Sequence, residues 1–512
     1  MSESKSFERL QRFCRYGNAI ILFGLAVYFF LIPGLSVVID LCDPALRGDG
    51  IPRCAWRRHR ALTPEYERWA RRRIASGRAE ELGVHNISGT EWPLFGSVFY
   101  LWATKSLQEA WEANGLKSPA PREYARGAIV AASELVLDPG HATWVKRHWG
   151  EDYLHEENVF YRMLVISALT SRANLLGDRW KLDLLRDQVE SLAIALDESP
   201  HGLLDDYPGE CYPGDVVAAV AAIRRADDAL GTDHSSFVAR SLRAFQGELV
   251  DSTGLPPYAA DSRRGVCRTR VRGCGNSYVA LFAPALWPDV GGRWYAHYEE
   301  HFWQRRWPFA GFREFPKDVE GRDFYMDVDA GPVVRGFGTA ACAFGAGAAR
   351  VNGRFDHAYP LAAQMIAASW PLPNGTLLMP RVLSNGVDAP YLGEAAMLYC
   401  LTRRPAPGVS SKTGGALTAF VYLLLCAYFG IGTALVLLGY VRLRRARKRP
   451  WSEAGPAPVV QAAIWAALAL GGVVALIVLS WPMALAGVGT ILVAQLFPWR
   501  AGPCRSSIPE SS

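Results

Sequence analysis

The chain has 512 residues, of which 50% are hydrophobic and 20% charged, and its formal net charge is +6 at pH 7. This composition is that of a globular protein with additional apolar sequence, and the length exceeds one typical domain. We expect no nucleic-acid partner, because the positive charge gathers in segments that flank apolar stretches.

The first apolar stretch predicts a membrane span over residues 18–40. Residues 19–39 contain no charge, and the preceding residues 1–17 carry Lys5, Arg9, Arg12 and Arg15. Basic residues on one flank are typical of the cytoplasmic side of a span. A cleaved signal peptide is the competing interpretation, but no small-x-small cleavage site follows, which favours an uncleaved anchor.

The C-terminal region predicts further spans. Residues 415–441 form the second one, and the basic loop 442–457, which begins "RLRRARKRP", marks the cytoplasmic side. Residues 458–498 are too long for one upright helix, so they are expected to break at Trp481-Pro482 into two spans, returning 499–512 to the cytoplasm. The sequence thus predicts a protein of the bacterial inner membrane, in contact with the lipid bilayer, whose main domain is extracytoplasmic.

The exported position makes disulfides possible. Cys42 and Cys54 lie in a Pro/Gly-rich linker, residues 41–61, and are a plausible pair; Cys267 and Cys274 are a second possibility. Neither pairing follows from the sequence alone.

Residues 62–404 predict an all-α domain of six helical hairpins. Charged amphipathic segments near 64–80, 122–138, 179–197, 234–250, 291–306 and 355–370 alternate with segments that are apolar almost all round. Each apolar segment opens with a carboxylate or an amide: Glu91, Asn158, Asp215, Asn276, Asp329 and Glu394. Their spacing gives a repeat of about 60 residues, which predicts an (α/α)6 toroid.

Parallel inner helices in such a ring would bring all six polar residues to one funnel. The alternative is that they are ordinary helix N-caps. Three stretches, "HEENVFY", "GECYPGD" and "YMDVDAGP", add polar groups beyond those that capping requires, namely Glu157, Tyr161, Cys211, Tyr212, Tyr325 and Asp327. Carboxyl groups beside tyrosine and cysteine can divide general-acid and general-base work when burial separates their pKa values.

A basic loop, residues 261–273, holds Arg268 and Arg270 among five arginines. It could hold an anionic group, or it could be a solvated hairpin. His297 and His301 lie four residues apart on a predicted outer helix, where surface positions are more common than metal ligands. We expect no metal and no cofactor.

Residues 85 to 402 resemble the linalool dehydratase/isomerase family, most clearly in "ENVFY", "CYPGDVVAAVAAIRRADDALGTD", "NSYVALFAPALWPDVGGRWYAHY" and "MDVDAGPVVRGFGTAACAFGAGAARVNGRF". The family has an (α/α)6 barrel, and Cys211, Pro213 and Asp215 match its cysteine motif. The resemblance implies metal-free removal of water from, or isomerisation of, a tertiary terpene alcohol. Two family acid–base positions hold Leu164 and Val220 here, and Glu91 or Tyr100 are possible counterparts of a third.

The sequence therefore predicts a membrane-anchored lyase or isomerase acting on a hydrophobic alcohol or a lipid-linked molecule. The predicted catalytic residues are Cys211, Asp215, Glu157, Tyr212, Asp329 and Glu91. The predicted substrate-binding residues are Trp92, Asn158, Phe160, Tyr161, Asn276, Asp327, Glu394, Arg268 and Arg270. Two alternatives stay open: a lyase, epimerase or hydrolase of an envelope glycan, possibly anionic, and a non-catalytic protein that binds a lipid, a glycan or a protein partner.

Overall fold

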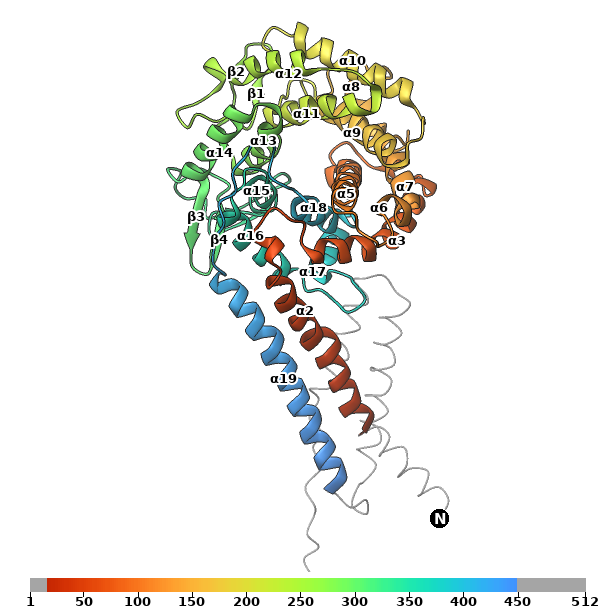
Figure 1. Ribbon diagram of the computed structural model, residues 1–512, viewed down its shortest axis with the longest axis vertical. Coiled ribbons are helices and arrows are strands. Elements are labelled where there is room, and N and C mark those ends of the chain that lie inside the picture. Colours follow the sequence, from red (N-terminus) through yellow and green to blue (C-terminus); the bar gives the residue numbers. More distant parts are fainter. Residues whose placement is uncertain (1–15, 449–512) are drawn as a thin grey trace, which may run out of the picture. The chain divides into compact units, whose positions relative to one another are not determined.

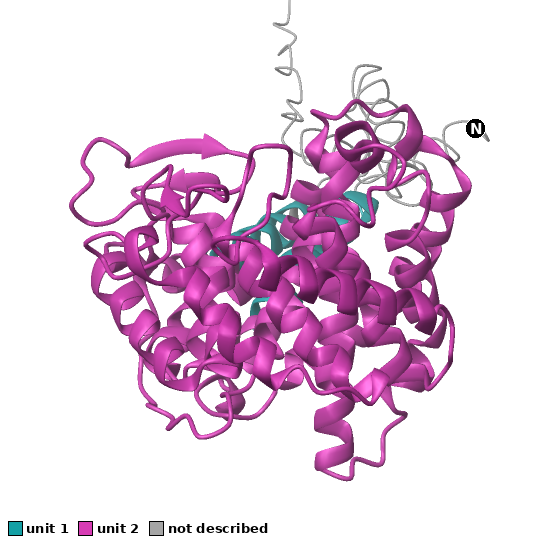
Figure 2. Ribbon diagram, turned by 90° about the horizontal axis from the view of Figure 1, so that it is seen from above, with its two compact units in different colours: residues 1–35, 425–512 teal, residues 36–424 magenta. Residues whose placement is uncertain are grey.

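The computed structural model describes residues 16–448 and falls into two compact units (Figure 2). Unit 1 comprises residues 1–35 and 425–512, and unit 2 comprises residues 36–424. The described chain is mostly helical, as the sequence predicted.

Two long apolar helical segments lie at the ends of the described chain. The first, Tyr16–Leu41, includes a π-helical turn η1 (Val27–Leu31) and α2 (Ile32–Leu41); the second is α19 (Ala419–Lys448). By length and composition each is able to cross a membrane, although a signal sequence near the N-terminus has the same properties. They lie where spans 18–40 and 415–441 were predicted, whereas 458–498 falls outside the described residues.

Six apolar helices of unit 2 contact one another in a closed cycle. Each packs against the next in the sequence, and the last packs against the first (Figure 1). They are α5 (Ile87–Ala113), α9 (Val159–Leu176), α11 (Pro213–Leu230), α13 (Gly273–Leu286), α15 (Thr339–Val351) and α18 (Leu392–Leu401). Each helix thus has two inner neighbours, which explains why apolar residues surround almost its whole circumference.

Amphipathic helices lie against this cycle and bury one face on it. α7 packs on α5 and α9, α10 and α12 on α11, α14 on α13, α16 on α15, and α3 and α17 on α18. Their bounds are α3 (Arg53–Ala75), α7 (Arg126–Val136), α10 (Leu182–Glu198), α12 (Ser235–Ser241), α14 (Pro288–Phe302), α16 (Phe355–Ala368) and α17 (Leu378–Gly386). The alternation of apolar and amphipathic segments in the sequence corresponds to these two sets of helices. The six helices of the cycle are called the inner helices below, and the amphipathic helices that pack on them the outer helices.

Short elements complete unit 2. The remaining helices are η2 (Pro44–Leu46), α4 (Arg78–Glu81), α6 (Pro121–Tyr124), α8 (Thr143–Trp149), η3 (Leu242–Phe245) and η4 (Gly247–Leu249). Three small antiparallel sheets pair β1 (Ala260–Asp261) with β2 (Val266–Cys267), β3 (Trp303–Arg306) with β4 (Phe309–Phe312), and β5 (Phe324–Asp327) with β6 (Gly331–Val334), which also pairs with β7 (Phe337–Gly338).

The β5–β6–β7 sheet corrects one element of the sequence analysis. Asp329 was placed at the start of an inner helix, but it lies in the turn between β5 and β6, and α15 begins ten residues later, at Thr339. Gly331 and Gly336 adopt φ values of 63° and 85°, which glycine tolerates and a helix does not contain. The two glycines form turns, so this segment is a sheet although its apolar composition is typical of a buried helix.

The polar residues at the inner helices do not act as N-caps. Asn86 caps α5, so that Glu91 lies inside the helix, while Asp215 and Glu394 lie in the first turns of α11 and α18. Asn158 occupies the N-cap position of α9 in a left-handed conformation, and its side chain makes no capping hydrogen bond. The side chains of these residues are therefore available for other contacts.

Neither predicted disulfide is formed. All described cysteines are free; Cys42 is exposed in the turn after α2, whereas Cys54 is fully buried in α3. The Cys274 thiol is buried and donates to the Glu314 carboxylate, 3.0 Å away. Proximity in sequence suggested both pairs, but the members of each pair lie in different elements: Cys42 in a turn and Cys54 in α3, Cys267 in β2 and Cys274 in α13.

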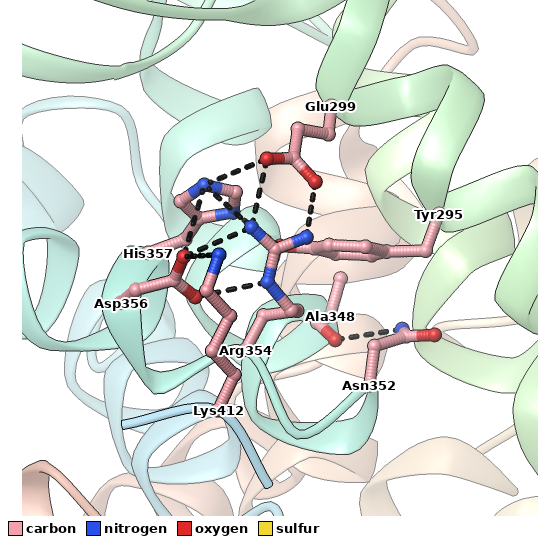
Figure 3. A network of polar contacts seen from close by, with 8 residues as sticks. All are labelled: Tyr295, Glu299, Ala348, Asn352, Arg354, Asp356, His357 and Lys412. Carbon is pink, nitrogen blue, oxygen red and sulfur yellow. Dashed lines mark hydrogen bonds and ion pairs between the residues drawn. The ribbon is translucent and has the colours of Figure 1, made fainter. Parts of the chain in front are cut away.

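A polar network attaches the segment before α19 to the outer helices (Figure 3). Arg354 forms a bidentate ion pair with Glu299 of α14 and bonds to Asp356 of α16, which also pairs with Lys412 at 3.1 Å. The backbone of Lys412 donates to the Gly353 carbonyl (2.7 Å). Arg354 and Lys412 lower the pKa of Asp356 to about 2 despite its partial burial, so the network stays charged at physiological pH.

Close approach of α13, α15 and α18 generates a stability prediction. A Cβ atom at Gly347 of α15 would lie 2.9 Å from Leu281 Cδ1 and 3.4 Å from the Cys400 Cα atom. We expect Gly347→Val to lower the free energy of unfolding by about 1–3 kcal/mol, because the extra atoms overpack the interface. Gly292→Val, on α14 with nothing within 4 Å, is the control and should change it by less than about 0.5 kcal/mol. Urea unfolding of the full chain in detergent compares the two; equal effects would contradict the packing argument.

Candidate functional site

Three carboxyl groups from distant parts of the chain interact electrostatically in unit 2. Glu91 comes from α5, Asp215 from the first turn of α11, and Asp329 from the β5–β6 turn. Asp215 and Asp329 both raise the pKa of Glu91, and Asp329 also raises that of Asp215. The charge of Asp329 therefore acts on both Glu91 and Asp215, which makes these three carboxyl groups a candidate site.

Glu91 is the most deeply buried of the three, with 6% of its surface exposed. Burial raises its pKa to about 8, and the two neighbouring carboxyls add to the rise, while a hydrogen bond with the Tyr207 side chain opposes it. Glu91 therefore carries a proton at neutral pH. A neutral carboxylic acid in this position can donate a proton, as a general acid must.

Asp215 is partly buried and, within residues 16–448, its carboxyl group has no hydrogen-bond or ion-pair partner. Burial and the charge of Asp329 raise its pKa. The neighbouring Asp206 is almost completely buried, and burial together with Asp215 raises its pKa as well. One Asp206 oxygen accepts from the Tyr212 backbone N–H at 2.8 Å, and the other has no partner. Asp215, whose carboxyl group is unpaired and whose pKa is raised, is therefore able to act as a base.

Asp329 accepts a short hydrogen bond from the Tyr258 phenol. Its side chain is open to solvent, yet protein groups surround it closely enough that desolvation raises its pKa. The Arg272 guanidinium lies 4.4 Å from the centre of the Tyr258 ring and pairs with Asp327 (2.6 Å), which fixes the ring beside Asp329.

Aromatic rings of the inner helices gather near these carboxyls. The Phe95 ring lies 5.7 Å from Phe160, 6.0 Å from Tyr278 and 6.4 Å from Phe344, measured between centroids. The three phenylalanines keep part of their surface exposed, and Asp215 raises the pKa of the Tyr278 phenol. The Tyr278 hydroxyl is buried without a partner. The site thus combines acidic groups with an accessible apolar wall.

Cys211 lies among the carboxyls but does not offer a reactive thiolate. The residue is fully buried, and burial together with Asp206, Asp205 and Asp215 raises the pKa of its thiol far above the usual value. A neutral thiol is a poor nucleophile and a weak base. Cys211 is therefore placed at the site but unsuited to nucleophilic catalysis.

Two other predicted catalytic residues are engaged in structural contacts. Glu157 accepts from the Asp205 backbone N–H (2.7 Å) and pairs with Arg263 (2.6 Å), which ties the loop before α9 to the basic loop. The Tyr212 hydroxyl donates to Glu210 (2.9 Å), while its ring meets the Tyr258 ring edge-on at 5.3 Å. Tyr212 therefore lies beside the site and supports Tyr258.

Several of the residues singled out from the sequence make contacts within the protein. Tyr161 donates to the Val136 carbonyl at the end of α7 and so contacts the outer helices. Glu394 pairs with Arg381 (2.6 Å) in a crevice between α3, α17 and α18. Tyr100 is buried, hydrogen-bonded to Thr63 and stacked on Tyr66. Trp92 is partly buried in the first half of α5.

The two asparagines among the predicted substrate-binding residues each have a side-chain oxygen that accepts no hydrogen bond. Asn158 donates to the Tyr153 carbonyl and Asn276 to the Pro256 carbonyl, but the side-chain oxygen of each is buried without a partner. Such an oxygen is costly to leave unpaired, which is a feature often found at functional sites. Both remain candidates for positioning a substrate.

The arginines of the basic loop are mostly paired within the protein. Arg268 pairs with Asp261, Arg270 with Asp318, and Arg272 with Glu314 and Asp327. These guanidinium groups are thus already neutralised by carboxylates. This arrangement does not support the prediction that the basic loop binds an anionic ligand.

Tyr207, Tyr258 and Asp206 were not predicted from the sequence as residues of the site. Tyr207 and Asp206 precede Cys211 by only four and five positions, so the loop that contains the cysteine motif was a usable signal. Tyr258 lies in "LPPYAA", which shows no pattern of its own. Its place opposite Asp329 follows only from the tertiary fold.

One group of metal-ligand side chains occurs among the described residues. His297, Glu300 and His301 of α14 have ligand atoms within 4.8 Å of one another, and Glu300 is exposed. The group lies on an outer helix and is not part of the candidate site.

No protein-family model matches this chain, and no curated protein matches its sequence.

The protonation of Glu91 generates a pH prediction. Its carboxyl binds the proton more tightly in the folded than in the unfolded chain, so its contribution to stability is complete below the ordinary pKa of 4.5 and is lost as the pH rises to about 8. Between pH 5 and pH 8 we expect the wild type to lose about 2–4 kcal/mol of unfolding free energy relative to Glu91→Gln.

Denaturant unfolding at pH 5, 6.5 and 8 measures this difference, and in infrared spectra at pH 7 Glu91→Gln should weaken the absorption of protonated carboxyl groups. Asp289→Asn, at the exposed start of α14, is the control and should keep the wild-type profile. Parallel profiles for Glu91→Gln and the wild type would show that Glu91 is ionised in the folded protein.

Proposed function

We propose that unit 2 is an (α/α)6 toroid with its active site at Glu91, Asp215 and Asp329. The closed cycle of six inner helices, covered by amphipathic helices, supports this architecture. Two of the three carboxyls come from inner helices and one from the loop before the fifth. That placement agrees with a funnel lined by residues near the starts of the inner helices.

The proposed reaction is removal of water from a hydrophobic alcohol, or its allylic isomerisation, as in the linalool dehydratase/isomerase family that the sequence resembles. The observation that carries the proposal is the trio of carboxyl groups, in which Glu91 holds a proton while Asp215 has no partner. An acid and a base of similar strength, facing one region, suit paired proton transfers.

The chemical steps can be written with the residues of this chain. Glu91 gives its proton to the substrate hydroxyl, the C–O bond breaks and water leaves. Asp215 takes a proton from the neighbouring carbon, whose electron pair forms the alkene. Positive charge that develops on carbon is stabilised by the faces of Phe95, Phe160 and Phe344. Proton transfer from Asp215 back to Glu91 completes the cycle. In isomerisation no carbon proton is removed: water adds to the other end of the allylic cation and gives its extra proton back to the Glu91 carboxylate.

This assignment differs from the residues of the related family. The positions of the family histidine and second cysteine hold Leu164 and Val220, both completely buried. Cys211 is present but carries a neutral thiol. In the proposal Glu91 and Asp215 replace these groups, while Tyr207 and Tyr258 position Glu91 and Asp329 through their hydrogen bonds.

The charge at the site favours a neutral substrate. Carboxyl groups predominate, and the nearby arginines are engaged in ion pairs. A phosphate or a sugar acid would be repelled, so a neutral apolar alcohol is a better substrate than a lipid-linked phosphate or an anionic glycan. Anchoring through Tyr16–Leu41 and α19 would keep the enzyme where such an alcohol dissolves, in a bilayer, with unit 2 on the extracytoplasmic side.

Catalysis can be tested with the full chain in lipid nanodiscs and with linalool, geraniol and farnesol as probe alcohols, followed by gas chromatography of the products. We expect wild-type turnover and at least about a 100-fold loss of kcat in Glu91→Gln and Asp215→Asn, because each removes one proton-transfer partner. Asp289→Asn is the matched control, since it removes an exposed carboxylate from α14.

A purely binding protein would give a different result. It would retain a hydrophobic molecule through purification, detected by mass spectrometry, and Glu91→Gln and Asp215→Asn would not change its amount. A glycan-processing enzyme would release fragments from cell-envelope glycan and leave the three alcohols intact. Either outcome would contradict the proposed reaction.

A further inference from the structure

The tip of the β3–β4 hairpin exposes a tryptophan beside the first turn of α19. β3 and β4 pair from Trp303↔Phe312 to Arg306↔Phe309, which leaves Trp307 and Pro308 as the connecting turn. The Trp307 side chain is 70% exposed, a costly position for so large an apolar ring in water. No ring contact involves it among the described residues.

The hairpin is held directly against α19. The Pro308 carbonyl accepts a hydrogen bond from the Phe420 backbone N–H at 3.0 Å, and the Phe309 ring lies 4.8 Å from the Phe420 ring. Gln364 of α16 bonds both to the Ala310 backbone and to the Thr418 hydroxyl, which joins the same two segments a second time. All these residues belong to unit 2. Trp307 is therefore fixed at the level where α19 leaves the unit.

The side chains around this junction have the character of a membrane interface. Tyr422 and Leu423, one turn into α19, are 56% and 52% exposed. Arg305 is exposed, and within the described residues its guanidinium has no ion-pair partner, whereas Arg306 pairs with Asp323. Tryptophan and tyrosine favour the headgroup region of a bilayer, and an unpaired arginine can bind lipid phosphate.

We propose that the β3–β4 hairpin is an interfacial anchor, with Trp307 inserted among the phospholipid headgroups and Arg305 in contact with their phosphates. This inference rests on the proposal that α19 spans a membrane. The bilayer is the occupant that the position of the hairpin specifies, because a span that begins at Ala419 brings headgroups to the level of Phe420. The anchor adds a third attachment of unit 2 to the membrane and restricts its tilt.

The test uses the full chain in phosphatidylcholine/phosphatidylglycerol vesicles, with an environment-sensitive fluorescent amino acid introduced at one position at a time. The positions are Trp307, Phe324 and Leu437. Phe324 of β5 is the matched control, since it is an equally exposed aromatic residue, at 74%, on a different hairpin. Leu437, 58% exposed within α19, reports whether that helix spans the bilayer. Phospholipids spin-labelled in the headgroup or deep in the acyl chain serve as quenchers.

We expect headgroup-labelled lipid to quench the probe at position 307 at least about three times more strongly than the probe at 324, and acyl-labelled lipid to quench the probe at 437. Equal quenching at 307 and 324, with strong quenching at 437, would overturn the anchor and leave the span in place. Absence of quenching at 437 would overturn the span and the anchor with it. Arg305→Gln should weaken quenching at 307 in phosphatidylglycerol-rich vesicles, and an unchanged value would remove Arg305 from the contact.

Discussion

The closed packing of six apolar helices is the constraint on which unit 2 depends. Each helix must fit between two others. The helix backbones therefore come close together where a small residue, such as Gly347 of α15, lies at the contact. A helix enclosed in this way has almost no polar face. Polar side chains can then be accommodated chiefly at helix ends and in the connecting loops, which is where Asp215 and Asp329 are found.

Burial near those ends changes the proton affinity of the carboxyl groups. Desolvation raises the pKa values of Glu91, Asp215 and Asp329; the charge of Asp329 adds to the rise at Glu91 and Asp215, and Asp327 and Glu210 add to the rise at Asp329. The nearby arginines are engaged elsewhere, with Arg272 directed at Glu314 and Asp327. The raised proton affinity is thus a property of the arrangement, since each carboxyl alone would be ionised in water at neutral pH.

The loops between the helices give the site its asymmetry. The β5–β6–β7 sheet carries Asp329, and the loop before α11 carries Tyr207 and Cys211, so the residues around the carboxyls come from dissimilar segments. A second sheet, β3–β4, contacts the start of α19. Insertions of this kind leave the helical packing unchanged while they supply both the proposed active site and the proposed membrane contact.

The sequence by itself determined the helical class, the alternation of apolar and amphipathic segments and the two long apolar helices, because hydrophobic periodicity and length follow from the order of residues along the chain. It also singled out Glu91, Asp215 and Asp329, the carboxyl groups of the proposed site, although it placed each at the start of a helix and none of them acts as a cap. Only the tertiary structure decided which polar groups meet. It engaged Glu157, Glu394 and Tyr161 in structural contacts, kept the cysteines apart and brought Tyr258 to Asp329 across 71 residues. Long-range pairing and burial, which set these contacts and the pKa values, depend on how helices and loops pack, and no local pattern encodes that.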